Sequence, residues 1–158
     1  GAYLNKITNR KMLLWDGTCI VHIQFSEREL IGIKVENPSA LFIAHPECPE
    51  AILKHADHIG STSSLIQFVS QSQNNEFIIG TEPNVIHQMR KKNPEKKFIE
   101  VPGADGNCSC NRCPYMALNT MEKIYLNLKD SKPDIYLSDT LINEAKKPLQ
   151  RMLDMTNN

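Results

Sequence analysis

Three of the five cysteines of this chain lie within six residues of one another, at Cys108, Cys110 and Cys113. The glycines just before them predict that they lie on a loop. Thiols gathered this densely on a loop typically bind a metal ion or a cluster, or carry out redox chemistry. A structural zinc ion needs four ligands in a closed set, whereas thiolates also hold iron–sulfur clusters. The spacing does not distinguish a zinc ion from an iron–sulfur cluster. In either case, Cys19 and Cys48 are the distant thiols that could complete the set of ligands.

The run His45-Pro46-Glu47 is a second candidate for chemistry. Because the proline stiffens the turn, we expect His45 and Glu47 to face one crevice as an acid–base pair or as hydrogen-bond anchors. The alternative is an ordinary polar loop at the end of a strand, since such loops are common.

A glycine followed by hydroxyl residues, Gly60-Ser61-Thr62, predicts the start of a helix. Free backbone amides and the positive end of the helix dipole would suit an anion there. The alternative is that one hydroxyl simply caps the helix. The position of this turn beside the other candidates favours the anion site.

An α/β fold would position these residues. Short apolar runs without polar alternation predict buried strands at residues 12–15, 41–44, 58–60, 77–80 and 98–101. Helical patterns alternate with these strands, and one of them begins at a capping box formed by Ser26 and Glu29. This alternation predicts three-layer α/β/α units, in which a short parallel sheet is covered on both faces. Two more helices are predicted after the cysteine loop, and Thr120 or Asn119 would cap the first of them.

Sheets of this kind bind ligands at the carboxyl ends of their strands. Most of the chemically interesting residues follow a predicted strand, namely Cys19, His22, His45, Glu47, Thr62, Thr81 and the cysteine loop. Their common position predicts one shared site along one edge of the sheet.

Composition narrows the class of protein. The chain has 158 residues, enough for a sizeable core, and its 18 basic residues match its 18 acidic ones. A nucleic-acid partner is therefore not expected, because phosphate binding normally needs a basic excess. No apolar run approaches the ~20 residues that span a membrane, so no membrane partner is expected either. An odd number of clustered cysteines indicates a reducing, cytoplasmic setting. Gly1 falls inside a helical pattern, so we also expect an N-terminally incomplete chain.

Five stretches, taken together and in order, resemble the quinolinate synthase family, the iron–sulfur enzymes of de novo NAD biosynthesis. These stretches are Leu14-Trp15-Asp16-Gly17-Thr18-Cys19-Ile20-Val21-His22, Ala44-His45-Pro46-Glu47-Cys48-Pro49, Gly60-Ser61-Thr62-Ser63, Ile79-Gly80-Thr81-Glu82 and Cys113-Pro114-Tyr115-Met116-Ala117-Leu118-Asn119-Thr120. The resemblance covers essentially the whole chain.

The resemblance implies three similar α/β domains around a pseudo-threefold axis, each giving one cysteine to a central 4Fe-4S cluster. Two ligands map to Cys19 and Cys113, and the third is expected upstream of Gly1. Residues 1–24 would end the second domain, residues 25–113 would form the third, and residues 114–158 would form a C-terminal helical segment. No role follows for Cys48, Cys108 or Cys110.

The resemblance also implies the residues that handle substrate. His45 and Glu47 map to the catalytic and substrate-binding pair of the family, with Pro46 between them, and Thr62 would hold a substrate carboxylate. His22 is expected as a further substrate contact or as support for a ligand.

The implied reaction condenses iminoaspartate, supplied by L-aspartate oxidase, with dihydroxyacetone phosphate to give quinolinate, phosphate and water. The cluster would act as a Lewis acid through an iron without a protein ligand. The resemblance makes the chain part of a condensing transferase, and we expect the 158 residues alone to be inactive. The alternatives are a zinc-binding module without catalysis and a degenerate, inactive fragment.

Overall fold

The computed structural model describes residues 1–103 and 111–156. The chain divides into two compact units, Gly1–Leu118 and Asn119–Asn158. The helices of the first unit are α1 (Ala2–Thr8), α2 (Ile20–Ile23), α3 (Glu27–Glu36), α4 (Glu50–Leu53), α5 (Thr62–Gln71) and α6 (Asn84–Lys92). Its strands are β1 (Leu41–Ala44), β2 (His58–Ile59), β3 (Glu76–Gly80) and β4 (Lys97–Glu100), and a 3-10 turn follows at Met116–Leu118.

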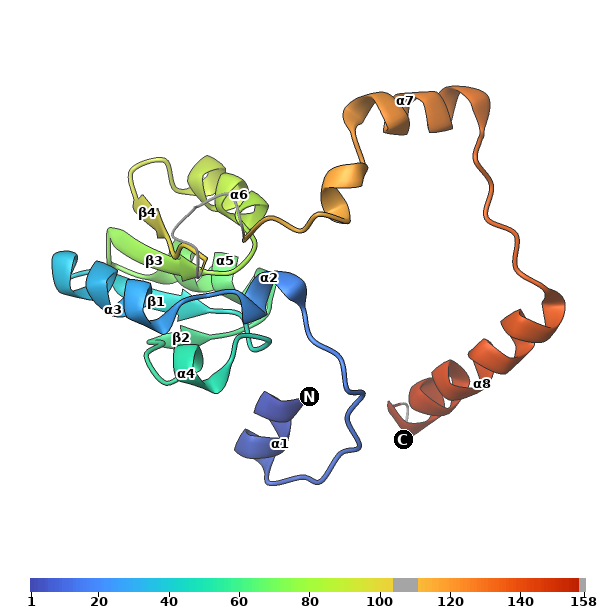
Figure 1. Ribbon diagram of the computed structural model, residues 1–158, viewed down its shortest axis with the longest axis horizontal. Helices are drawn as coiled ribbons and strands as arrows, with labels where there is room; N and C mark the ends of the chain where they lie inside the picture. Colours follow the sequence, from blue (N-terminus) through green and yellow to red (C-terminus); the bar gives the residue numbers. More distant parts are fainter. Residues whose placement is uncertain (104–110, 157–158) are drawn as a thin grey trace. The chain divides into compact units, whose positions relative to one another are not determined.

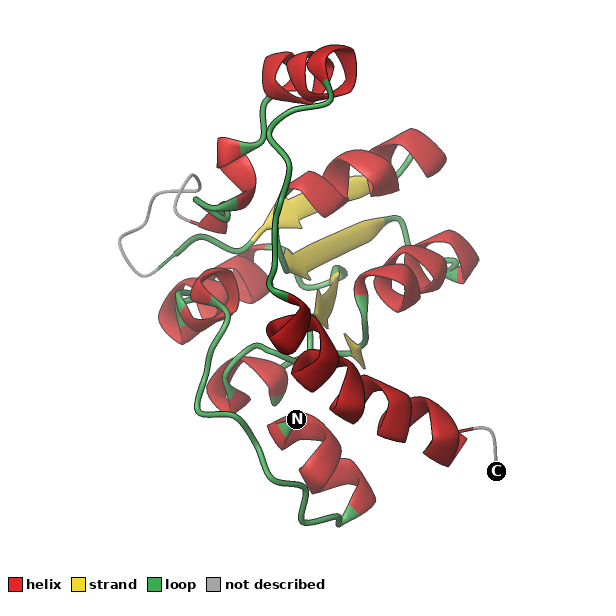
Figure 2. Cartoon of the chain, turned by 90° about the vertical axis from the view of Figure 1, so that its right-hand side faces the viewer, coloured by secondary structure: helices red, strands yellow, loops and turns green. Residues whose placement is uncertain are grey.

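The four strands form one parallel sheet in the order β2-β1-β3-β4. In this order each strand adds to one side or the other of β1, which is typical of a doubly wound sheet. Helices lie on both faces of the sheet (Figures 1 and 2). The predicted parallel sheet is therefore confirmed, and its four strands fall within one residue of the predicted ranges.

Alternate side chains of the strands form two separate cores. One core contains Phe42, Ala44 and Ile78 and packs against residues of α3 and α4. The other contains Ile43, Phe77 and Ile79 and packs against α5 and α6. Because successive side chains of a strand point to opposite faces, apolar residues at every position require a helix layer on each side. This arrangement confirms the three-layer α/β/α unit.

The predicted strand at residues 12–15 is wrong. No strand forms there, and Leu13 and Trp15 are 102% and 92% exposed. A strand needs a neighbour for its backbone hydrogen bonds, and no described strand pairs with this segment. An apolar run of this length indicates a tendency to be buried, but it does not supply the pairing partner.

The second unit contains α7 (Met121–Asp130) and α8 (Asp139–Thr156). The hydroxyl of Thr120 accepts a hydrogen bond from the amide of Lys123 at 3.2 Å, which confirms the predicted cap. In the first unit, the Ser26 hydroxyl likewise accepts from the amide of Glu29 at the start of α3. Among the described residues, no helix is both long enough and apolar enough to cross a membrane.

Gly80, at the carboxyl end of β3, provides a test of this packing. A Cβ at Gly80 would lie 2.9 Å from the ring of Phe42 and 3.4 Å from the Cβ of Ala44. We therefore expect Gly80→Ala to lower the free energy of unfolding by roughly 1–3 kcal/mol, as overpacking does. The matched control is Gly32→Ala on α3, where nothing lies within 4 Å; it should stabilise the helix by about 0.5–1 kcal/mol. Urea unfolding of both variants is the measurement, and a Gly80→Ala variant as stable as the wild type would contradict this packing.

Candidate functional site

The carboxyl edge of the sheet gathers three of the predicted site residues. His45 directly follows β1, and Thr81 directly follows β3. The two strands pair with Ala44 opposite Gly80, and the amide of His45 donates to the carbonyl of Gly80 at 3.1 Å. Parallel pairing therefore places His45 and Thr81 side by side, with Glu47 on the turn that follows His45.

Helix α2 carries His22 onto this edge. The rings of His22 and His45 stack with centroids 4.5 Å apart and an interplanar angle of 13°. The Nε2 atom of His22 lies 3.2 Å from the Thr81 hydroxyl. Its Nδ1 atom lies 3.3 Å from Oε2 of Glu47, and the Nδ1 atom of His45 lies 3.6 Å from the same oxygen. One carboxylate therefore faces two stacked imidazoles.

Burial keeps both imidazoles neutral near pH 7. It lowers the pKa of His22 to about 4, the His45 ring acts in the same direction, and the Glu47 carboxylate opposes them. Burial also lowers the pKa of His45 against the opposing effect of Glu47. Neutral imidazoles can each accept and donate one hydrogen bond, so the pair is suited to orienting a ligand and to passing on a proton.

Cys19 lies next to this histidine pair, at the N-cap of α2. Ligand atoms of Cys19, His22 and Glu47 all lie within 4.8 Å of one another. Thiolate, imidazole and carboxylate are the ligands that transition metals bind in proteins. Among the described residues, this is the group whose spacing suits a metal, and it contains the predicted metal ligand Cys19.

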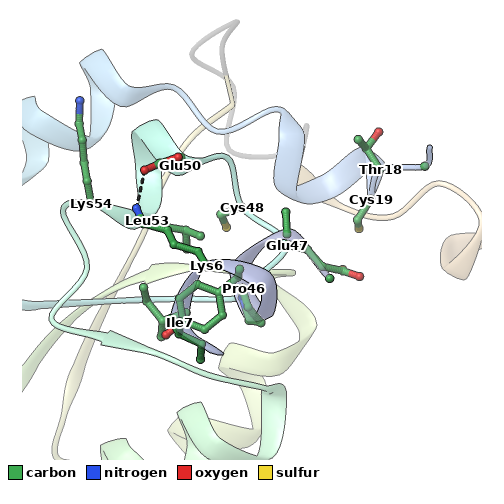
Figure 3. Close-up of a pocket in the computed structure, with 15 residues that line it drawn as sticks. Lys6, Ile7, Thr18, Cys19, Pro46, Glu47, Cys48, Glu50, Leu53 and Lys54 are labelled. Carbon is green, nitrogen blue, oxygen red and sulfur yellow. Dashed lines mark hydrogen bonds and ion pairs between the residues drawn. The ribbon is translucent and has the colours of Figure 1, made fainter. Parts of the chain in front are cut away.

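A pocket of about 430 Å³ opens beside Cys19. Figure 3 shows Cys19, Glu47 and Cys48 along it, together with an ion pair between Lys6 of α1 and Glu50 of α4. Cys48 is only 5% exposed, and its thiol donates to the Gly80 carbonyl at 3.4 Å. Burial raises the pKa of the Cys48 thiol to about 12, and the neighbouring Cys19 and Glu47 also raise it. Cys48 is therefore a buried thiol rather than an available thiolate.

The segment that carries Cys113 is fixed to the same unit at two points. Gly103 forms an antiparallel bridge with Phe25, three residues after His22. The side chain of the buried Asn111 donates to the carbonyl of Val101, just past β4. Cys113 itself is partly exposed, and it is not part of the group around Cys19. Cys108 and Cys110 lie outside the described residues.

Two buried polar atoms lack a hydrogen-bond partner among the described residues. They are Nδ1 of His22 and Oδ1 of Asn111. A buried polar atom left unpaired is costly and calls for a reason, such as a role in a site. The two atoms fall on the two segments that carry the predicted cluster ligands.

Thr62 stands apart from the other predicted substrate residues. It is the first residue of α5, and its side chain is exposed. The Ser61 hydroxyl caps the helix by accepting from the amide of Ser64 at 3.3 Å. None of the described side-chain contacts joins Thr62 to His45 or Glu47.

Sequence reasoning gave no specific role to Thr81, although it is one of the closest neighbours of His22. The available signal was a hydroxyl residue directly after the last residue of a strand. The ion pair between Lys6 and Glu50 joins residues 44 positions apart and left no signal in the sequence.

The cysteines of this site should differ in their rates of alkylation. In the native, reduced chain near pH 8, we expect iodoacetamide to modify Cys19 and Cys113 well before Cys48, because the thiolate is the reactive form and burial raises the pKa of Cys48. Peptide mass spectrometry follows each site, with the urea-unfolded chain as the control in which all thiols react alike. Equal rates for Cys48 and Cys19 in the native chain would contradict this environment.

The neutral state of His22 predicts a pH-dependent stability. Its pKa is 6.5 when solvated and about 4 in the fold, so between these values the unfolded chain binds a proton that the folded chain does not. Stability should therefore fall as the pH drops from about 6.5 to 4. Between about pH 7 and pH 4.5 we expect the wild type to lose roughly 2 kcal/mol more than His22→Gln does.

Urea unfolding at the two pH values measures this difference. The control variant is His87→Gln, at an exposed histidine. This variant should lose as much stability between the two pH values as the wild type does. If His22→Gln loses as much stability as the wild type between the two pH values, the neutral state of His22 does not explain the pH dependence.

Comparisons with known proteins give the family of this chain. The model of the family described as quinolinate synthetase A protein matches residues 1–154. The chain is 52% identical over 156 residues to the quinolinate synthase of Synechocystis sp. and 51% identical to that of Microcystis aeruginosa. It is 50% identical over 157 residues to the quinolinate synthase of Cyanophora paradoxa.

These alignments cover 99% of this chain and 47–49% of the three relatives, so the chain spans about half of their length. The family model matches nearly every residue, and about half of the aligned positions are identical in these relatives. The chain belongs to the quinolinate synthetase A protein family.

Proposed function

We propose that this chain forms the part of a quinolinate synthase that supplies two cluster ligands and one wall of the substrate site. The observation that carries the proposal is the gathering of Cys19, His22 and Glu47 within 4.8 Å, at the carboxyl edge of the sheet, in a member of this family. A zinc-binding module without catalysis is not favoured, because the relatives along the whole chain are named as enzymes.

The proposed cofactor is a 4Fe-4S cluster with Cys19 and Cys113 as two of its three ligands. Both thiols are partly exposed, as ligands of a shared group must be before it binds. Oδ1 of Asn111, two residues before Cys113, is buried and has no hydrogen-bond partner among the described residues. An unpaired polar atom in this position supports a bound group with polar or ionic character.

The proposed reaction joins iminoaspartate to dihydroxyacetone phosphate and releases phosphate and two waters. When bound, the cluster supplies a Lewis acid that polarises a hydroxyl which must leave. The side chains of this chain then bind the substrate, orient it and move its protons.

His45 and Glu47 are the proposed catalytic pair. The Glu47 amide donates to Nδ1 of His45 at 3.4 Å, which leaves Nε2 of His45 as a donor toward substrate. The Glu47 side chain is 55% exposed and so remains free to accept a proton. Pro46 holds the two residues in one turn. His22 positions the pair through its stacked ring on His45 and its contact with Glu47.

Thr62 is the proposed carboxylate anchor. Its helix has ten residues, so the positive end of the helix dipole reinforces the free amides of the first turn. Ser61 already caps the helix, and the hydroxyl of Thr62 has no partner among the described side chains. Both features support anion binding over capping for Thr62.

The proposed function also implies a source of substrate, a cellular compartment and a division of the chain into domains. Iminoaspartate would come from L-aspartate oxidase, and the reducing cytoplasm would keep the thiolates intact. Residues 1–24 would belong to the second of three α/β domains, residues 25–113 to the third, and residues 114–158 to a C-terminal segment. With two of three cluster ligands, the 158-residue chain would not turn over by itself.

Quinolinate formation by the product of the complete coding sequence tests the function. The protein is purified without oxygen and given iminoaspartate and dihydroxyacetone phosphate. We expect Cys113→Ser to abolish activity and to lower the bound iron, because it removes a cluster ligand. Cys108→Ser is the matched control, five residues earlier in the sequence, and should keep both the activity and the iron.

Three outcomes would contradict the proposal. They are no quinolinate from the intact protein, equal loss in both variants, and one zinc with no acid-labile sulfide in place of iron. The first outcome would disprove the proposed function. The second would disprove the choice of Cys113 as a ligand, and the third would disprove the iron–sulfur cluster.

A further inference from the structure

Thr81 is a polar side chain beside the histidine pair that has no role in the chemistry proposed above. It is 3% exposed and directly follows β3, with its hydroxyl 3.2 Å from Nε2 of His22. A buried hydroxyl at this distance is a hydrogen-bond partner, and its direction decides which nitrogen of His22 carries the proton.

The surroundings of His22 fix that direction. A neutral imidazole has one N–H donor and one acceptor nitrogen. Nδ1 of His22 lies 3.3 Å from a Glu47 oxygen, and an ionised carboxylate can only accept. A bare lone pair at Nδ1 would face that negative charge at close range. The proton therefore belongs on Nδ1, and Nε2 must accept from Thr81.

His45 has the opposite arrangement. Its Nδ1 lies farther from the Glu47 carboxylate, at 3.6 Å, and already receives the amide N–H of Glu47 at 3.4 Å, so its proton belongs on Nε2. The two rings stack at 4.5 Å, yet they carry their protons on different nitrogens. Glu47 sets the tautomer of His45 with its own backbone, whereas the tautomer of His22 needs a donor from elsewhere.

We propose that Thr81 is a positioning residue, whose hydroxyl donates to Nε2 of His22 and thereby holds its proton on Nδ1, facing the Glu47 carboxylate. Nδ1 is buried and makes no well-directed hydrogen bond within the described residues. The Nδ1–H group of His22 is therefore a donor beside the Glu47 carboxylate, which is half exposed and can rotate toward it. The relevance to catalysis rests on the proposed function, but the tautomer itself does not.

Removal of the hydroxyl weakens this arrangement. Thr81→Val keeps the shape of the side chain but leaves Nε2 of His22 buried without a donor. Only the Glu47 carboxylate then favours the proton on Nδ1, so the Nε2–H form gains population, because an unpaired buried acceptor is costly. Thr81→Ser keeps a donor at the same position and should restore the wild-type state.

Nitrogen NMR of the ¹⁵N-histidine-labelled chain tests the proposal directly. Long-range proton–nitrogen correlations show which ring nitrogen carries the proton, and loss of signals in His22→Asn assigns that ring. At pH 7 we expect the Nδ1–H tautomer at His22 in the wild type and in Thr81→Ser. We expect a shift to the Nε2–H form or to a mixture in Thr81→Val.

An Nε2–H tautomer or a doubly protonated ring in the wild type would overturn the proposal without any variant. An unchanged tautomer in a folded Thr81→Val would overturn it as well. The measurement needs neither cluster nor substrate, so it stands if quinolinate formation fails. If the function holds, Thr81→Val in the intact enzyme should lower kcat several-fold while Thr81→Ser restores it.

Discussion

The candidate site depends on the parallel pairing of β1 with β3 in a single register. Ala44 lies opposite Gly80, so the next residues along the two strands, His45 and Thr81, are neighbours at the carboxyl edge. The pairing is tight because Gly80 has no side chain, and the ring of Phe42 fills the space that a Cβ would occupy. The Gly80 carbonyl also receives the His45 amide and the Cys48 thiol. A slip of one residue in β1 would remove His45 from Thr81 and would reverse the faces of the core side chains on that strand.

The sequence predicted the layers of this fold more accurately than the contacts within the site. Runs such as Phe77-Ile78-Ile79 are apolar at every position, and that pattern requires a strand covered on both faces. The run at residues 12–15 has the same composition yet forms no strand, because composition does not provide a pairing partner. The presence of His45 and Thr81 at one edge followed from the strand ends. The position of His22 between them did not, because α2 lies outside the sheet and no sequence period relates residue 22 to residue 81.

Two neutral imidazoles stacked beside a carboxylate are an expensive arrangement in a small domain. Burial lowers the pKa of both histidines, so folding in mild acid must exclude protons that the unfolded chain would bind. The fold accepts this cost at the sheet edge, where Cys19 and the open pocket also lie. Perturbed titratable groups beside a cavity are typical of functional sites. The membership of the chain in a family of named enzymes supports the same interpretation.

The central claim is that the sheet edge around His45 and the segment ending at Cys113 serve one metal-dependent site. An anaerobic crystal structure of the complete protein with a bound substrate analogue tests this claim most directly. We expect Cys19 and Cys113 to bind one iron–sulfur cluster, and His45, Glu47 and Thr62 to contact the analogue. A cluster or zinc ion held by Cys108, Cys110 and Cys113 away from Cys19, with the analogue bound elsewhere, would contradict it.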